Sequence, residues 1–149
     1  MFFIGAILAF LTDQISKHFV VSSLLPGESA SVVPNVLRWS YVQNTRGAFG
    51  LFGNQPFILI GMALVVLIVF WYAFRDIAAR SLLVRFAFGL IVGGAIGNII
   101  DRLHYRYVVD FIDFYRIWPN VFNVADSCIT IGVGLLIIST LKRERQSAN

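Results

Sequence analysis

Charged residues are scarce in this sequence, and cysteine and histidine are scarcer still. The single Cys excludes both a disulfide scaffold and a cysteine-built metal site. The two histidines, His18 and His104, lack the H-E-x-x-H spacing of a zinc peptidase, so neither a metal site nor a cofactor is expected. Only 13% of the 149 residues are Asp, Glu, Lys or Arg, whereas a soluble domain carries about a quarter.

Apolar residues dominate the remainder of the chain. They make up 58% of it, and the mean hydropathy is +0.77. A water-soluble domain of this size leaves much of its surface exposed and has no room to bury so many apolar side chains. The same composition excludes intrinsic disorder. The sequence therefore predicts an all-α integral membrane protein, with room for four spans of about 20 residues and modest extramembrane segments.

Four apolar runs are long enough to cross a bilayer as a helical bundle. We predict spans at about residues 1–25, 56–74, 82–102 and 124–141, within a single integral membrane domain over residues 1–149. A secretory signal peptide is the alternative for the first run, but the run lacks a basic leading segment and a small-residue cleavage site. We therefore expect an uncleaved first span.

The segments between the spans carry strand and boundary signals. Between residues 26 and 50, apolar and polar residues loosely alternate around a Pro34-Asn35 turn, which indicates a small β-rich cap outside the bilayer. Aromatic residues are frequent over 103–122, which is typical of an interfacial loop or helix at the membrane–water boundary.

Glycines recur every four residues in the third run, at Gly89, Gly93 and Gly97. Small residues at that spacing let a second helix approach closely. We interpret this stripe as a packing surface and not as part of a chemical site.

The orientation is predicted from the Lys and Arg residues at the span ends, which divide equally between the two sides of the bundle. On one side, a polar hairpin at 75–80 and the tail after residue 141 carry compact basic charge with few acids. On the other side, basic and acidic residues are mixed, as is expected where a functional site lies. We therefore place both termini in the cytoplasm. The basic residues form no stripe, so nucleic-acid binding is not expected.

Polar residues gather at the outer ends of two spans. Asp13 and Lys17 are four residues apart and share one helix face, where a local ion pair that eases insertion is the alternative to a functional role. Asn98, Asp101 and Arg102 likewise share one face at the end of the third run.

Two further acids follow in the chain. Asp110 lies in an apolar stretch, where burial is expected to raise a carboxyl pKa. Asp126 opens the fourth run, three residues after Asn123. A helix N-cap is the alternative role for Asn123 and for Asp126, because short side-chain oxygens accept the first N–H groups of a helix.

These acids are predicted to lie at one membrane depth. A conduction path needs polar groups distributed across the bilayer, whereas a hydrolytic site needs them gathered at one level with water at hand. Two carboxylates that share a proton can perform acid and base chemistry without a metal. The pattern favours an aspartyl hydrolase. An ion- or proton-coupled transporter, or a transporter subunit, is the alternative, and a purely structural membrane protein is a third possibility.

Five motifs, in order along the chain, closely resemble those of the bacterial lipoprotein signal peptidases, also called signal peptidase II. They are D-Q-I-S-K (13–17), N-T-R-G-A-F-G (44–50), G-G-A-I-G-N-I-I-D-R (93–102), V-V-D-F-I-D (108–113) and F-N-V-A-D-S (122–127). The resemblance covers nearly the whole chain. It implies an aspartyl endopeptidase of the bacterial inner membrane, active near the periplasmic face. Such an enzyme removes signal peptides from prolipoproteins just before a diacylglyceryl-modified cysteine.

The resemblance also implies roles for individual residues. Asp110 and Asp126 look like the catalytic pair. The positions that look like supporting or substrate-binding residues are Asp13, Lys17, Asn44, Asn98, Asp101, Arg102 and Asn123. Residues 26–50 resemble a periplasmic β-cradle, and 103–122 resemble a periplasmic helix over the site. The implied partners are lipidated prolipoprotein substrates, membrane lipids and cyclic peptide inhibitors, with no cofactor.

One motif departs from the pattern of that family. Arg46 and Gly47 stand where Gly-Ala is more common, while Asn44, Ala48 and Phe49 are retained. We expect the extra cation beside the site either to alter substrate preference or to pair with an acid.

Overall fold

The computed structural model describes residues 1–47, 55–78 and 81–147. That part of the chain holds four helices that are long and apolar enough to cross a membrane. Their bounds are α1 (Phe2–Ser23), α2 (Pro56–Ala78), α3 (Leu82–Tyr105) and α4 (Val124–Ser147). The predicted four-helix membrane protein with a small β-rich cap is confirmed. Arg80 of the predicted hairpin and residues 48–50 of the predicted cap lie outside the described residues.

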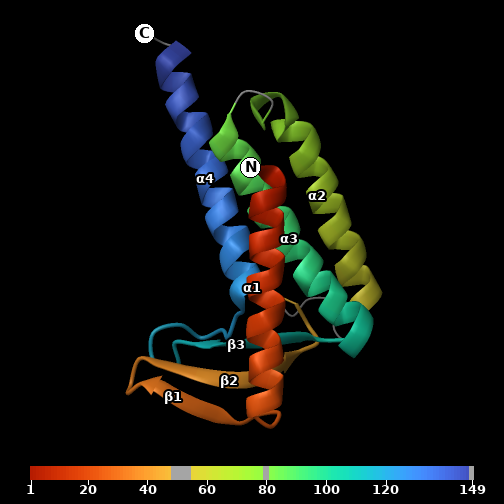
Figure 1. Cartoon of the computed structure of the whole chain (residues 1–149), viewed down its shortest axis with the longest axis vertical. Coiled ribbons are helices and arrows are strands. Elements are labelled where there is room, and N and C mark those ends of the chain that lie inside the picture. The colour runs from red at the N-terminus through yellow and green to blue at the C-terminus, as the bar shows by residue number, and fades with distance from the viewer. Residues whose placement is uncertain (48–54, 79–80, 148–149) are drawn as a thin grey trace.

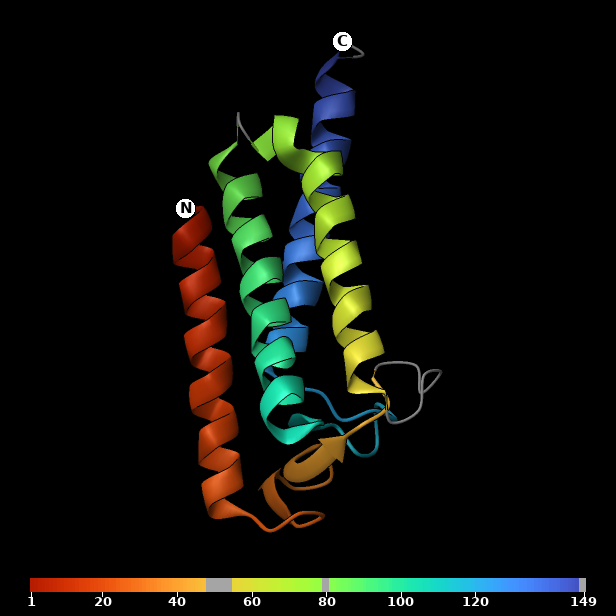
Figure 2. The same cartoon turned by 90° about the vertical axis from the view of Figure 1, so that its right-hand side faces the viewer.

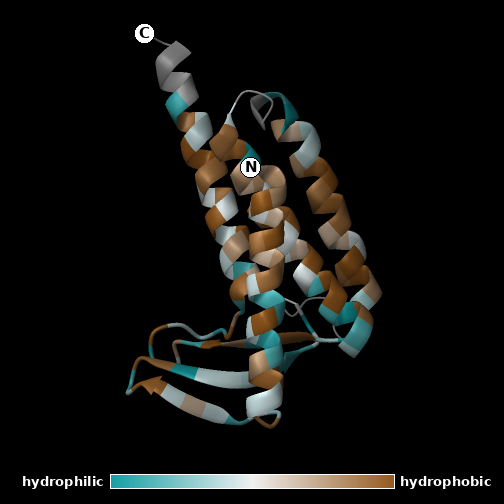
Figure 3. Ribbon diagram, in the orientation of Figure 1, coloured by the Kyte–Doolittle hydropathy of each residue, from teal (hydrophilic) through white to brown (hydrophobic). Residues whose placement is uncertain are grey.

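The start of α1 and the far end of α4 both lie at the end of the bundle that is opposite the sheet (Figure 1). The start of α1 and the far end of α4 are at the top of the view, whereas the three strands are at the bottom. Apolar residues cover the middle of the helices, and polar residues gather where the helices meet the sheet and at the opposite ends of α2 and α4 (Figure 3). This distribution fits a bilayer around the middle of the bundle, because hydrocarbon solvates apolar side chains.

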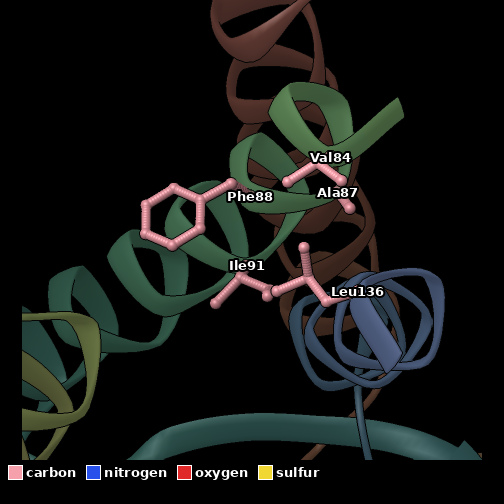
Figure 4. Close-up of a cluster of buried hydrophobic side chains, with 5 residues drawn as sticks. All are labelled: Val84, Ala87, Phe88, Ile91 and Leu136. Carbon is pink, nitrogen blue, oxygen red and sulfur yellow. The ribbon is translucent and has the colours of Figure 1, made fainter. Parts of the chain in front are cut away.

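Helix α3 lies at the centre of the bundle. In the most apolar 18-residue stretch of α3, 61% of the residues are buried, whereas none is buried in the corresponding stretch of α2. Helices α1 and α4 pack along α3, and α2 lies beside α3 (Figure 2). Val84, Ala87, Phe88 and Ile91 of α3 form a buried cluster with Leu136 of α4 (Figure 4). This core holds α3 and α4 together on the side away from the sheet.

The glycine stripe of α3 sets its distance from α1. A Cβ atom on Gly89 would overlap the carbonyl oxygen of Phe2, and one on Gly93 would overlap that of Ala6. On the opposing helix, a Cβ on Gly5 would lie 2.5 Å from the carbonyl oxygen of Phe86. The packing role predicted for the stripe is confirmed at Gly89 and Gly93, where the two backbones approach too closely for any larger residue. Gly97 instead lies against the Asp13 carboxylate of the candidate site.

The cap is a three-stranded antiparallel sheet in the order β1-β2-β3. Strands β1 (Ser29–Val33) and β2 (Leu37–Asn44) are joined at the predicted Pro34-Asn35 turn, where Asn35 has a φ of 62°. Asn is among the few residues that tolerate this left-handed conformation.

The third strand corrects the expectation for the segment after α3. An interfacial loop or helix was expected over 103–122, but α3 continues to Tyr105 and Val108–Asp113 forms strand β3. No helix is present in 106–123, a segment that the structure describes throughout. The reason is tertiary, because β3 pairs with β2 and so satisfies its backbone groups there.

The sheet is fixed against the end of the bundle by its own apolar cluster. Val20 of α1, Tyr41 of β2, and Val109 and Phe111 of β3 are buried together. This contact holds β3 beside α1 and α3, so the acid between Val109 and Phe111 lies where the sheet meets the helices.

Candidate active site

Lys17 of α1 is buried among acceptors. Its ammonium donates to Asp13 Oδ2 at 2.8 Å, to Asp101 Oδ2 at 2.9 Å and to Asn98 Oδ1 at 2.9 Å, and its side chain is only 4% exposed. These three acceptors satisfy all three protons of the ammonium. The local ion pair with Asp13 is therefore present, but it is part of a buried cluster that joins α1 to α3.

Asp13 also connects α1 to α4. Its second oxygen, Oδ1, accepts a 2.9 Å hydrogen bond from the backbone N–H of Ala125, in the first turn of α4. The first N–H groups of a helix have no partner within the helix, and that end carries partial positive charge. A buried carboxylate from a distant helix thus fixes the start of α4.

Asp101 connects α3 to the sheet in a similar way. Its Oδ2 accepts a 3.1 Å hydrogen bond from the backbone N–H of Val109 in β3, and its Oδ1 accepts from Gln14 Nε2 at 3.2 Å. Because Val109 directly precedes Asp110, this contact fixes the backbone beside that acid.

Asn98 lies between the lysine and Asp126. Its Oδ1 accepts from Lys17 Nζ, and its Nδ2 donates to Asp126 Oδ1 at 2.8 Å. An ammonium can only donate, so the oxygen of the amide must face Lys17 and the NH₂ group must face Asp126. The lysine therefore determines which end of Asn98 meets the acid.

Asn123 combines both roles that the sequence left open. Its Oδ1 accepts from the backbone N–H of Asp126 at 2.9 Å, which caps α4. Its Nδ2 donates to Asp110 Oδ1 at 2.7 Å, with longer contacts to Asn98 Oδ1 and to the carbonyl oxygen of Val109. One fully buried amide thus fixes the helix that carries Asp126 and contacts Asp110 directly.

Asp110 receives a second amide from the sheet. Asn44, the last residue of β2, donates from Nδ2 to Asp110 Oδ2 at 2.8 Å. The Asn44 side-chain oxygen accepts the backbone N–H groups of Arg46 and Gly47, at 3.1 and 3.0 Å. Both carboxyl oxygens of Asp110 are therefore held by asparagine amides from different elements.

Arg102 contributes a cation next to these acids. Its Nη1 donates to the carbonyl oxygen of Asn98 at 3.3 Å, one turn earlier in α3. Its Nε is buried and is, within the described ranges, the one buried side-chain nitrogen or oxygen without a hydrogen-bond partner. A buried donor of this kind is costly to leave without an acceptor.

These side chains meet at a cavity of about 970 Å³. Asp110 and Asp126 both line it, together with Asn44, Asn98 and Arg102. The walls come from the end of β2, the start of β3, the segment 119–122 and the first turns of α4. Asp13, Lys17, Asp101 and Asn123 lie behind that wall, so the structure brings all nine predicted site residues into one connected cluster.

The environment of Asp110 favours its protonated form. Burial raises the pKa of this carboxyl to about 7, and the nearby Asp126 carboxylate acts in the same direction. The amides of Asn44 and Asn123 oppose the rise, because they donate to the carboxylate oxygens. A carboxyl with this pKa can hold or release a proton near neutral pH.

Within the described residues, no group of three or more His, Cys, Asp or Glu side chains could hold a metal ion.

Two supporting groups were not predicted from the sequence. Gln14 contacts both Asp13 and Asp101, and Asp113 accepts from Arg38 Nε at 2.6 Å and from Ser40 at 2.8 Å. Asp113 is buried in β3 and ties that strand to β2. In the sequence, Asp113 is visible only as a second acid in the apolar segment that holds Asp110. Its partners on β2 follow from the pairing of the two strands, which the sequence does not show.

Comparison with known proteins agrees with this arrangement. The family described as "Signal peptidase (SPase) II" matches residues 5–142. The lipoprotein signal peptidase of Moorella thermoacetica is 41% identical over 91% of this chain and 89% of its own length. That of Halothermothrix orenii is 39% identical over 97% and 98%.

Solved structures show the same fold. A bacterial membrane enzyme determined by the in meso method at 2.3 Å superposes with a TM-score of 0.83 and 33% identity, over 93% of this chain and 86% of that one. The names of the relatives support a peptidase and not the transporter alternative. The chain therefore belongs to the signal peptidase II family, and it is a peptidase with four apolar helices suited to a multi-pass bacterial membrane protein.

Proposed function

We propose that this chain is an aspartyl endopeptidase that removes the signal peptide from lipid-modified precursors. It cuts just before a cysteine that carries diacylglyceryl, with Asp110 and Asp126 as its catalytic pair. The observation that carries the proposal is the cavity that both carboxyl groups line, in which each is held by an asparagine amide from another element. The family match and the names of the relatives support this substrate class.

The catalytic pair works with one shared proton. The ionised carboxylate takes a proton from a water molecule, whose oxygen attacks the carbonyl carbon of the scissile peptide bond. The protonated carboxyl donates its proton to the carbonyl oxygen, so a neutral tetrahedral intermediate forms. As the C–N bond breaks, the protonated carboxyl gives its proton to the leaving amine and one hydroxyl group of the intermediate returns its proton to the ionised carboxylate, so the pair again holds one proton. The raised pKa of Asp110 supports a single shared proton near neutral pH.

The partners of the pair suit this chemistry. Asn98, Asn123 and Asn44 are neutral donors, so they orient the carboxyl groups without the strong stabilisation of the ionised form that a direct ion pair would give. The nearby ammonium of Lys17 is already satisfied by its three acceptors and contacts neither acid of the pair. One proton can therefore remain in the pair.

Arg102 is proposed to bind the substrate. Arg102 lines the cavity, and its buried Nε is unpartnered in the described part of the chain. A peptide carbonyl oxygen next to the scissile bond would supply the missing acceptor. A hydrogen bond to this carbonyl would hold the substrate backbone in position beside the catalytic pair.

The proposed setting is the bacterial inner membrane, with the sheet and the cavity on the periplasmic side and both termini in the cytoplasm. The start of α1 and the far end of α4 lie at the end of the bundle away from the sheet, which supports a common side for the two termini (Figure 1). The cleavage point of a signal peptide follows its apolar segment. A pair placed where helices meet sheet would face that point, and the lipidated substrate would enter from the bilayer. Membrane lipids and cyclic peptide inhibitors are further proposed partners.

The test is cleavage of a diacylglyceryl-modified precursor by the purified protein in detergent. Asp110→Asn and Asp126→Asn should each reduce cleavage to background while the circular dichroism spectrum stays that of the parent protein. Asp76→Asn is the matched control, because Asp76 is an exposed acid at the far end of α2. Retained cleavage in either of the first two variants would remove that residue from the catalytic pair.

Dependence on the lipid is tested with the same precursor lacking diacylglyceryl. The wild-type protein should cleave the lipidated form and leave the unlipidated form intact. Equal cleavage of both forms would contradict the proposed substrate class while leaving the catalytic pair in place.

A further inference from the structure

Arg46 follows the end of β2 and lines the same cavity as Asp110 and Asp126. Its backbone is tied to the site by Asn44, whose side-chain oxygen accepts the Arg46 N–H at 3.1 Å while its amide donates to Asp110. A single side chain thus fixes the position of the Arg46 backbone relative to a carboxyl of the proposed catalytic pair.

The Arg46 guanidinium has no ion pair among the described residues, although acids lie nearby. The four salt bridges of the described residues involve Lys17, Arg38 and Arg75. Arg106 lies over the ring of Phe57. The exposed Arg46 side chain takes part in none of these ion pairs and lies over no aromatic ring among the described residues. The alternative that the sequence left open, an ion pair between Arg46 and an acid of the site, is therefore not found in this part of the chain.

The position of Arg46 indicates which part of a substrate it would meet. It lies on the sheet side of the cavity, two residues beyond the end of β2. In the proposed function, the residues before the scissile bond form the apolar signal segment, and the residues after the lipidated cysteine leave the membrane. In the proposed function, a cation on the sheet side would therefore meet the residues that follow the cysteine.

We propose that Arg46 is a specificity-determining residue that favours precursors with Asp or Glu directly after the lipidated cysteine. This inference rests on the proposed function. A guanidinium binds a carboxylate through two parallel hydrogen bonds, which a neutral amide does not reproduce. Because the site is open to water, the preference is modest, about two- to fivefold in kcat/KM, as for other exposed ion pairs.

The experiment compares lipidated peptides that differ only in the residue after the cysteine, which is Asp, Asn or Lys. Wild-type protein should cleave the Asp peptide about two- to fivefold more efficiently than the Asn peptide, mainly through a lower KM, and the Lys peptide least efficiently. Arg46→Gln should bring the Asp-to-Asn ratio to about one, whereas Arg46→Lys should retain part of the preference. Added salt should reduce the wild-type ratio.

Arg116→Gln is the matched control, because Arg116 is an exposed arginine between β3 and α4 that does not line the cavity. It should keep the wild-type ratio. Cleavage of all peptides by the wild type without an Asp preference, or an unchanged ratio in Arg46→Gln, would overturn the inference alone. Failure of the wild type to cleave any lipidated peptide would overturn the proposed function, and the inference with it.

Discussion

Lys17 Nζ lies 2.9 Å from Asn98 Oδ1, and this contact orients the amide whose other end meets Asp126. The lysine belongs to α1 and the asparagine to α3, so the packing of these two helices determines the orientation of an acid on α4. The glycine stripe of α3 permits that packing. A Cβ on Gly97 would overlap the Asp13 carboxylate that also holds Lys17. Helix packing and site geometry are therefore coupled.

Replacing Lys17 should destabilise the fold. Lys17→Met keeps much of the side-chain volume but leaves the carboxylates of Asp13 and Asp101 buried without their common cation. Breaking a buried ion pair by removing one partner costs about 3–5 kcal/mol. Thermal unfolding in detergent, followed by circular dichroism, measures the loss. Lys142→Met, at the exposed end of α4, should leave the unfolding temperature unchanged. Equal effects of the two substitutions would contradict the role of the buried cluster.

Replacing the Asn98 amide should affect catalysis more than stability. Asn98→Asp keeps an acceptor for Lys17 but removes the donor to Asp126 and places a carboxylate against it. Because this donor orients a proposed catalytic carboxylate, its loss should lower kcat by about 10²-fold, the lower end of what loss of an oxyanion donor costs. Cleavage of the lipidated precursor measures the loss, with the unfolding temperature as the check on folding. A variant that folds and retains wild-type kcat would exclude Asn98 as a positioning residue.

Stability should fall as the pH rises towards neutrality. The pKa of Asp110 is raised from 3.8 to about 7 in the fold, so the folded chain binds this proton more tightly than the unfolded chain. The contribution of that proton is fully present below about pH 4 and is lost as the pH rises through about 7. Unfolding temperatures between pH 5 and pH 8 measure the slope. In Asp110→Asn the slope should be smaller, and identical slopes in the two proteins would contradict the raised pKa.

Activity should decline on the alkaline side of neutrality. Once both carboxyl groups are ionised, no proton remains for the substrate carbonyl. A pH profile of kcat with saturating lipidated substrate measures this loss. A rate that rose steadily to strongly alkaline pH would contradict catalysis by a shared proton.

A side chain on Gly93 should separate α1 from α3. The added methyl group of Gly93→Ala would overlap the backbone carbonyl of Ala6, so the helices must move apart. Overpacking of this kind costs about 1–3 kcal/mol. Gly134→Ala on α4 is the control, because a Cβ there meets nothing within 4 Å. The control should be neutral or stabilising, since Ala favours a helix over Gly by about 1 kcal/mol. The comparison uses unfolding temperatures in detergent.

Sequence reasoning predicted the site residues better than it predicted the sheet. The spacing of Asp13 from Lys17, and of Asn98 from Arg102, is local and follows the helical repeat, so it placed those residues on common faces. Strand β3 has no such local signature. Val108–Asp113 is a short apolar segment with two acids, and only its pairing with β2 makes it a strand.

The amino-acid sequence by itself determined the four membrane helices and the level at which the acids gather, because a bilayer demands about 20 apolar residues per helix and admits charge only where it can be satisfied. The tertiary structure alone decided which groups face Asp110 and Asp126. Asn44, Asn98 and Asn123 come from separate elements, and their amides were oriented by contacts between those elements. Hydrogen-bond direction depends on which donors and acceptors meet in space, and spacing along the chain does not encode it.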